Sequence, residues 1–187
     1  LAYWSWGLKK ANDWRERMGR ERNADWDRMA DQMAPWPVVN GVYVEAESVL
    51  EKDGGHPTQL AAYGFLPASA YLDKEVMRKT LRHVLDNWDW ADTWGWDFPL
   101  IAMTAIRLNE PEWALEALLK SVQKNTYLPN GHNFQNEGLP LYLPGNGGLL
   151  TVVAMMCAGW DGCTEGNPGF PKNGLWNVKW EGLKPAF

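Results

Sequence analysis

Tryptophan and aspartate alternate in one short stretch of this chain, "NWDWADTWGWDFP" at residues 87–99. An indole ring has an apolar face that can stack on the C–H face of a sugar, and its N–H can bond a hydroxyl. An aspartate beside it can accept hydrogen bonds or exchange a proton. The stretch therefore predicts a sugar-binding surface with Trp94 and Trp96 as its platform and Asp97 as the carboxyl group beside it.

Two carboxyl groups are the usual requirement for glycoside hydrolysis, and inverting enzymes hold them about 6.5–9.5 Å apart to admit a water. Asp97 and Glu137 are the predicted catalytic pair, and Asp92 is a further candidate. Each has a structural alternative. Asp97 can be a first-turn helix acid, which the helix dipole favours, and Glu137 can be a solvated loop residue. Many of the 13 tryptophans can likewise belong to the core.

Polar side chains in glycine-rich loops are further candidates to bind a sugar. Histidine rings can donate and accept hydrogen bonds, and asparagine amides do both. These side chains can instead brace loops or complete turns. The glycines of "GNGG" at residues 145–148 could also hold inorganic phosphate at a helix N-terminus. The predicted substrate-binding set is His56, Trp94, Trp96, Asn130, His132 and Asn146.

The composition excludes several classes of function. A formal net charge of −5 without a basic stripe argues against nucleic-acid binding. No run approaches 18 consecutive apolar residues, so we expect no membrane span. We find no zinc-ligand spacing and no Cys–His catalytic motif, and we expect neither a metal nor a cofactor. Cys157 and Cys163 are expected to be free, with a local bridge across "CAGWDGC" as the alternative.

Hydrophobic periodicity and capping residues predict a mostly helical chain. Asn40-Gly41 is a strong turn signal for a small β-hairpin near residues 38–47. The last segment, residues 174–185, alternates like a strand. Asn23, Thr58, Asp73 and Asn109 are the expected helix caps. The predicted helices are 3–19, 24–34, 58–66, 74–87, 96–108, 110–122 and 147–160.

The order of these helices predicts a ring. Helices 58–66, 96–108 and 148–158 are apolar on nearly all faces, which indicates burial on most sides. They alternate with the amphipathic helices 74–87 and 110–122, as inner helices do with outer ones in a ring of helical hairpins. Three loops precede buried helices: 54–57, the Trp/Asp stretch, and 125–147. We therefore expect all three to open on one mouth.

Three segments carry a family resemblance, "GHPTQLAAYGFLP", "TWGWDFPLIAMTAIRL" and "NGHNFQ…LPLYLPGNGGLLTVVAMM". A His-bearing loop, a Gly-Trp-Asp helix start and a Gly-Asn-Gly-Gly helix start follow one another in them. This order resembles the last hairpins of the six-hairpin glycosidases. These are the alpha/alpha-barrel glycoside hydrolases, which include the maltose phosphorylase-like (family 65) and family 95 alpha-fucosidase-like groups. The resemblance covers residues 1–160. It departs at Pro144, which stands where the fucosidase-like group has an aspartate.

The resemblance implies an all-α fold, an alpha/alpha toroid of which this chain forms about half. Residues 1–160 would be a partial catalytic barrel, and residues 161–187 a C-terminal loop and strand appendage. The rest of the barrel, or another chain, would cover the exposed flank of the half ring. The general acid of such enzymes lies on an earlier hairpin, upstream of Leu1, and the nucleophile can be water or phosphate.

We therefore expect a carbohydrate-active enzyme, an inverting glycoside hydrolase acting on an oligo- or polysaccharide. The main alternative is a non-catalytic glycan-binding or scaffold protein on a degenerate barrel, which the missing aspartate at Pro144 favours. A terpene-cyclase-like toroid is a third alternative, although the sequence shows no acidic run for a diphosphate-bound metal. No signal peptide is visible, and the substrate class alone indicates a periplasmic or secreted location.

Overall fold

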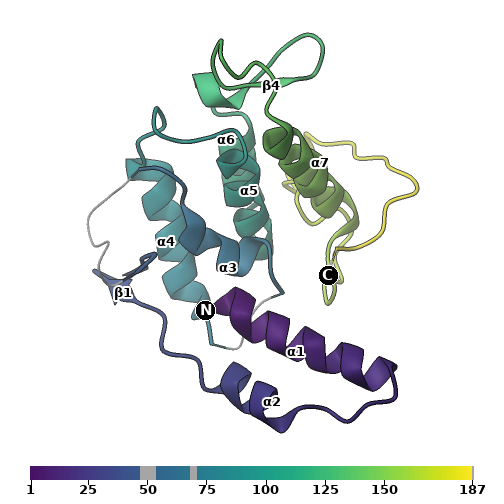
Figure 1. The fold of residues 1–187 in the computed structure, drawn as a ribbon. Coiled ribbons are helices and arrows are strands. Elements are labelled where there is room, and N and C mark those ends of the chain that lie inside the picture. The colour runs from purple at the N-terminus through teal and green to yellow at the C-terminus, as the bar shows by residue number, and fades with distance from the viewer. Residues whose placement is uncertain (47–53, 68–70, 187) are drawn as a thin grey trace.

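The computed structural model describes residues 1–46, 54–67 and 71–186, and this part of the chain is mostly α-helical (Figure 1). Two antiparallel two-stranded ribbons pair β1 (Val38–Val39) with β2 (Val42–Tyr43), and β3 (Thr126–Tyr127) with β4 (Asn133–Phe134). Short 3₁₀ turns are η1 (Thr58–Leu60) and η2 (Gln123–Asn125). The α-helices are α1 (Ala2–Arg17), α2 (Ala24–Asp31), α3 (Ala61–Gly64), α4 (Lys74–Asn87), α5 (Asp97–Arg107), α6 (Pro111–Leu118) and α7 (Leu143–Ala158).

Two predicted caps start their helices as expected. The Asn23 side-chain oxygen accepts from the backbone N–H groups of Asp25 and Trp26 at the start of α2, at 3.0 and 3.2 Å. Asp73 accepts in the same way from the second and third residues of α4. Each cap satisfies N–H groups that have no partner within the helix. Asn12, buried in α1, bonds the backbone of Asn23 and so joins α1 to α2.

The predicted hairpin is confirmed for the residues that the structure describes. Asn40 and Gly41 both have positive φ, 52° and 82°, as a two-residue type I′ turn requires. The turn pairs Val39 with Val42 and Val38 with Tyr43. The Tyr43 backbone N–H then bonds the buried Thr80 hydroxyl of α4 at 2.8 Å, which fixes the hairpin to the helical core. Residue 47, at the end of the predicted hairpin, lies outside the described residues.

Helix α5 lies at the centre of the fold, packed against α3, α4, α6 and α7. All 11 of its residues are buried, which confirms the predicted burial on most of its sides. Its partner α6 is shorter and less buried. Helices α1 and α2 pack mainly on each other and lie at the far end of the molecule from β4 (Figure 1). The mostly α-helical class is therefore as predicted, whereas the toroid stays a prediction.

Helix α7 differs from the expected buried helix. It is apolar along its whole length, yet Leu150 is 74% exposed and Leu143 is 67% exposed. The buried side of α7 packs on α5 through Gly148, whose Cα lies close to the Pro99 ring. Sequence apolarity alone cannot distinguish a helix buried on all sides from one whose apolar face is left uncovered.

Several predicted boundaries are wrong. Helix α7 begins at Leu143, four residues before the predicted start at residue 147, so Asn146 lies within the helix. Asn109 does not cap α6. It adopts a left-handed conformation, φ 61°, after the end of α5, and Glu110 takes the cap position without a side-chain bond. Thr58 is the first residue of η1 and not its cap.

The C-terminal segment is not a strand. Within residues 161–186 the backbone forms no ladder, and only an isolated parallel bridge joins Ala186 to Trp160. Strand pairing needs a neighbouring backbone to accept and donate, and residues 174–185 form no bridge with any other described residue. Leu175 is 84% exposed, so the alternation of apolar residues does not mark a buried face. Cys157 and Cys163 are both free, which excludes the local bridge.

Two adjacent glycines of α7 test how tightly it packs on α5. A Cβ at Gly148 would lie 2.7 Å from Pro99 Cγ, whereas a Cβ at Gly147 would meet nothing within 4 Å. We expect Gly148→Ala to lower the free energy of unfolding by about 1–3 kcal/mol, because the rigid proline ring cannot yield. Gly147→Ala should raise it by about 0.5–1 kcal/mol through helix propensity. Urea unfolding measures both, and equal effects would contradict this packing.

Candidate functional site

Asp97 is the centre of the candidate site, and its side chain has no exposed surface. Its Oδ2 accepts a hydrogen bond from the backbone N–H of Trp94 at 2.8 Å. In return the Asp97 N–H donates to the Trp94 carbonyl at 3.0 Å. This reciprocal pair resembles a capping box, in which an acid in the first turn reaches back to a free N–H. The first-turn acid expected from the sequence is therefore present, and it is also buried.

The loop before η1 brings His56 against this carboxylate. Nδ1 of His56 lies 3.1 Å from each oxygen of Asp97. Two bonds hold the loop there: the buried Trp88 donates its indole N–H to the Gly55 carbonyl at 3.0 Å, and the Thr58 N–H donates to the His56 carbonyl at 2.8 Å. Trp88 of the Trp/Asp stretch is thus a structural residue that positions the histidine.

Trp94 and Trp96 are half-buried, and their ring centroids lie 6.4 and 4.9 Å from that of His56. The Trp96 indole Nε1 lies 3.1 Å from His56 Nδ1, and the Trp96 ring stacks on Phe65 with a centroid distance of 6.3 Å. The Trp94 ring lies 5.5 Å from that of Tyr142, and Nζ of Lys124 lies 4.6 Å from the Trp94 ring centroid. The predicted platform and its carboxyl group are therefore together in space.

Burial controls the electrostatics of this cluster. Loss of hydration raises the pKa of Asp97 from the ordinary 3.8 to about 6, because the charged form is the one that needs water. The hydrogen bonds with the Trp94 N–H and with His56 lower the pKa of Asp97, but by less than burial raises it. Burial also raises the pKa of Tyr142, and the charge of Asp97 adds to this rise. Asp97 can therefore change protonation state in the weakly acidic range.

A cavity of about 310 Å³ adjoins the cluster through Trp96. Helices α3, α5 and α7 form its walls, with Phe65, Met103 and Met155 among the lining side chains. The volume lies at the lower end of the range for small-molecule sites, which are mostly apolar with a few polar groups. Trp96 thus contacts His56 through its indole nitrogen and also lines this cavity.

Gln135, which the sequence did not single out, attaches the long loop to this site together with Asn133. The Gly95 N–H donates to Gln135 Oε1 at 2.9 Å, and Gln135 donates to Asn133 Oδ1 at 2.9 Å. Both side chains are fully buried. A Cβ at Gly95 or at Gly145 would lie 1.8 or 2.1 Å from Asn133 Oδ1, so only glycine permits this approach. The alternation of Asn133 in β4 and Gln135 just after it was the available signal.

The other predicted residues are on or near the β3–β4 ribbon. Asn130 is exposed and its Oδ1 accepts from the His132 N–H at 3.1 Å, as a turn asparagine does. His132 is half-buried. Glu137 is exposed at a turn closed by the bridge of Asn136 with Leu139. Among the described residues, no hydrogen bond or ion pair links Asn130, His132 or Glu137 to Asp97 or His56.

The side-chain amide of Asn146 forms hydrogen bonds to the long loop through both its oxygen and its nitrogen. Its Oδ1 accepts from the Asn133 N–H at 3.0 Å, and its Nδ2 donates to the Gly131 carbonyl at 2.7 Å. The "GNGG" glycines lie inside the first turns of α7, after its start at Leu143. The interpretation of this run as a phosphate cradle before a helix is therefore wrong. In Figure 1, α5, α7 and β4 approach one another at the end where both helices begin.

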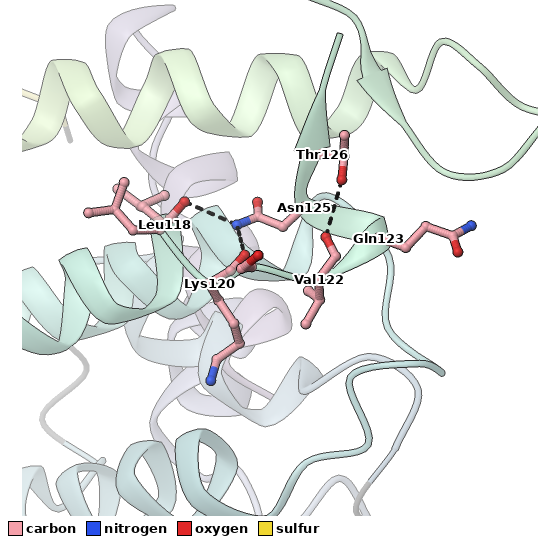
Figure 2. A pocket seen from close by; sticks show the side chains of 8 residues that line it. Leu118, Lys120, Val122, Gln123, Asn125 and Thr126 are labelled. Carbon is pink, nitrogen blue, oxygen red and sulfur yellow. Dashed lines mark hydrogen bonds between the residues drawn. The ribbon is translucent and has the colours of Figure 1, made fainter.

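Two further hollows lie at this end of the fold. One, of about 500 Å³, is lined by the segment from Leu118 to Thr126. Figure 2 shows the Asn125 amide donating to the carbonyls of Leu118 and Lys120, so this hollow is built around a helix C-terminus. The other, of about 440 Å³, lies between Trp90 and Lys124. Neither contains a residue of the predicted site.

The described residues contain no group of three or more His, Cys, Asp or Glu side chains placed to hold a metal ion. No helix in the same residues is long and apolar enough to cross a membrane. Comparison of the chain with protein-family models, with curated proteins and with solved structures finds no match. The site is therefore interpreted from its own geometry.

The raised pKa of Asp97 predicts a pH-dependent stability. Between about pH 4 and 6 the folded protein holds a proton that the unfolded chain has released, so this stabilisation is complete below that window and is lost as the pH rises through it. A shift of about two units corresponds to about 3 kcal/mol. Asp97→Asn, which cannot ionise, should gain up to that amount relative to the parent between pH 4 and 7.

Urea unfolding across this pH range measures the difference. Asp89→Asn is the matched control, because Asp89 is exposed and caps only its own turn. If the free energy of unfolding changed with pH in parallel for the parent and Asp97→Asn, Asp97 would already be ionised at the acidic end of this range. That result would contradict the effect of burial on its pKa.

Proposed function

We propose that this chain supplies a sugar-binding site of a carbohydrate-active enzyme, an inverting glycoside hydrolase acting on an oligo- or polysaccharide. One observation supports this most: two half-buried tryptophans lie beside a histidine that contacts a fully buried carboxylate. Aromatic faces suit the C–H face of a sugar, while histidine suits its hydroxyls. The adjoining cavity supplies room for an apolar-faced ligand.

The burial pattern supports a toroid of which these helices form part. Helix α5 is buried throughout, while α6 beside it is partly exposed, as inner and outer helices of a hairpin ring are. The apolar face of α7 exposes Leu143, Leu150 and Val153. In the proposal, the rest of the barrel or another chain covers this face. Exposed apolar patches of this kind commonly mark interaction sites.

The two predicted catalytic carboxyls take different roles in this proposal. Asp97 has no exposed surface and acts through His56, which is 37% exposed at its side chain. Glu137 is exposed on its turn and is free to meet a substrate held beyond the ribbon. The general acid belongs to another part of the barrel. The distance between two reacting carboxyls is thus set only in the assembled ring.

A second candidate function is glycan binding without catalysis. The burial of Asp97 favours it, because a carboxyl that water cannot reach cannot itself touch a glycosidic bond. Pro144 in place of an acid points the same way. Both candidates require the same aromatic site, and they differ only in whether the bound sugar is cleaved.

The platform tryptophans should determine glycan affinity. Removing the Trp96 ring takes away stacking surface worth about 1.5–3 kcal/mol, so Trp96→Ala should weaken binding about 10- to 100-fold. Trp14→Ala is the control, because Trp14 is 60% exposed on α1. A glycan array followed by calorimetric titration measures both. Unchanged affinity in Trp96→Ala, or an equal loss in Trp14→Ala, would refute the platform.

Hydrolysis distinguishes the two candidate functions. In the complete protein, Asp97→Asn and Glu137→Gln keep shape and hydrogen bonding but remove a titratable group. If the enzyme proposal holds, at least one variant should lose about 10²- to 10⁴-fold in kcat with nearly unchanged sugar affinity. Glycan binding by a parent protein that cleaves none of the bound sugars would favour the non-catalytic candidate.

A further inference from the structure

Two groups compete for one atom of His56, its Nδ1 nitrogen. Both oxygens of Asp97 and the indole Nε1 of Trp96 lie 3.1 Å from it. A ring nitrogen offers either a proton or a lone pair, so Nδ1 cannot donate to the carboxylate and accept from the indole at the same time. The position of a single proton therefore decides which of the two bonds forms.

An ionised Asp97 favours a proton on Nδ1. A lone pair there would face two carboxylate oxygens at 3.1 Å. This repulsion is strong because Asp97 has no exposed surface and the local dielectric is low. A proton on Nδ1 replaces the repulsion with a charge-assisted hydrogen bond. The lone pair of the neutral ring then lies on Nε2, which has no hydrogen bond to the described residues.

We propose that His56 is the proton-transferring residue of this site, with Nε2 as the reacting atom and Asp97 as the positioning residue that keeps the proton on Nδ1. The inference rests on the proposed function, since the O–H that reacts belongs to a bound sugar or to its attacking water. For the attacking water, Nε2 takes the proton, and the oxygen uses the released electron pair to bond the anomeric carbon as the glycosidic C–O bond breaks. The leaving oxygen takes its proton from the general acid elsewhere in the barrel. The His56 ring becomes an imidazolium whose charge Asp97 balances. The proton later leaves Nε2 for water.

The same proton releases the Trp96 indole N–H. When Nδ1 donates to Asp97 it cannot accept from Trp96, so the indole N–H is available to an oxygen of the ligand. The same proton on Nδ1 therefore leaves the Trp96 N–H available to a ligand and the His56 Nε2 lone pair available to accept a proton. This couples sugar recognition by Trp96 to the ionisation of Asp97.

Other charged or titratable groups near His56 are few. Asp97 on α5 is the only acid in contact with the ring among the described residues. Glu45, two residues from β2, bonds the Thr58 hydroxyl just beyond the loop. Lys124 lies over the Trp94 ring, and the Tyr142 ring lies against Trp94 in a tilted arrangement. The direct contact makes Asp97 the dominant partner of Nδ1.

The tautomer of His56 tests the inference directly and needs no ligand. Long-range ¹H–¹⁵N spectra of the labelled chain at about pH 9, above the ordinary range for histidine, distinguish the two ring nitrogens. We expect a protonated Nδ1 and an unprotonated Nε2 for His56. His83 is the internal control, because its Nδ1 lies 3.3 Å from the Asn87 amide nitrogen and must carry the lone pair. Protonation of His56 on Nε2 would overturn the proposal.

Two variants separate positioning from simple structural support. Trp96→Phe removes the competing N–H and should leave the His56 tautomer as in the parent. Asp97→Asn removes the negative charge and should shift His56 toward the opposite tautomer. Asp97→Glu restores the charge and should restore the parental tautomer. An unchanged tautomer in Asp97→Asn would show that Asp97 does not position the proton, and would overturn the inference.

The kinetics of a His56 variant, together with glycan binding, distinguish a failure of this inference from a failure of the proposed function. In the complete protein, His56→Gln should lower kcat by about 10²-fold or more, with a smaller change in KM. Normal kcat in His56→Gln would overturn the proton-transfer role while leaving the sugar site intact. The expected tautomer in a chain that binds no glycan would support the Asp97–His56 pair and refute the sugar as its substrate.

Discussion

A carboxylate buried without access to water must find its partners within the protein, and Asp97 imposes this constraint on its surroundings. Its oxygens need the Trp94 N–H, which fixes the first turn of α5, and they need His56, which fixes the loop before η1. Trp88 then holds that loop through Gly55. These bonds account for Asp97 and Trp88 of the stretch rich in tryptophan and aspartate, since burying the acid requires donors and burying the indole requires an acceptor. Asp89 and Asp92 of the same stretch are exposed.

A second set of buried polar groups joins the long loop to the same helix start. Gln135 and Asn133 satisfy backbone groups of Gly95, Lys124 and Thr126 while both side chains are excluded from water. The absence of a Cβ at Gly95 is what allows Asn133 to come so close. A network of this kind is stabilising only when every member is satisfied. It therefore holds Trp94, which packs on Tyr142, in a defined position beside His56.

The sequence predicted what local rules determine. The caps at Asn23 and Asp73, the Asn40-Gly41 turn and the buried α5 each follow from a few neighbouring residues. The clustering of His56 with Trp94, Trp96 and Asp97 followed from the expected common mouth of the loops. The burial of Asp97, the role of Gln135 and the early start of α7 could not be predicted, because each depends on contacts between distant segments. The C-terminal alternation failed as a strand signal because none of the strands in the described part of the chain lies beside it to pair with it.

The central claim is that Trp94, Trp96 and His56 form one sugar-binding site over a buried carboxylate. Its most direct test is a titration of the ¹⁵N-labelled chain with the oligosaccharides that a glycan array selects, followed through the indole N–H signals. The account predicts that the Trp96 and Trp94 signals shift together and saturate at one affinity, while the signals of Trp4 and Trp14 on α1 stay in place. Saturable shifts confined to other tryptophans would contradict it.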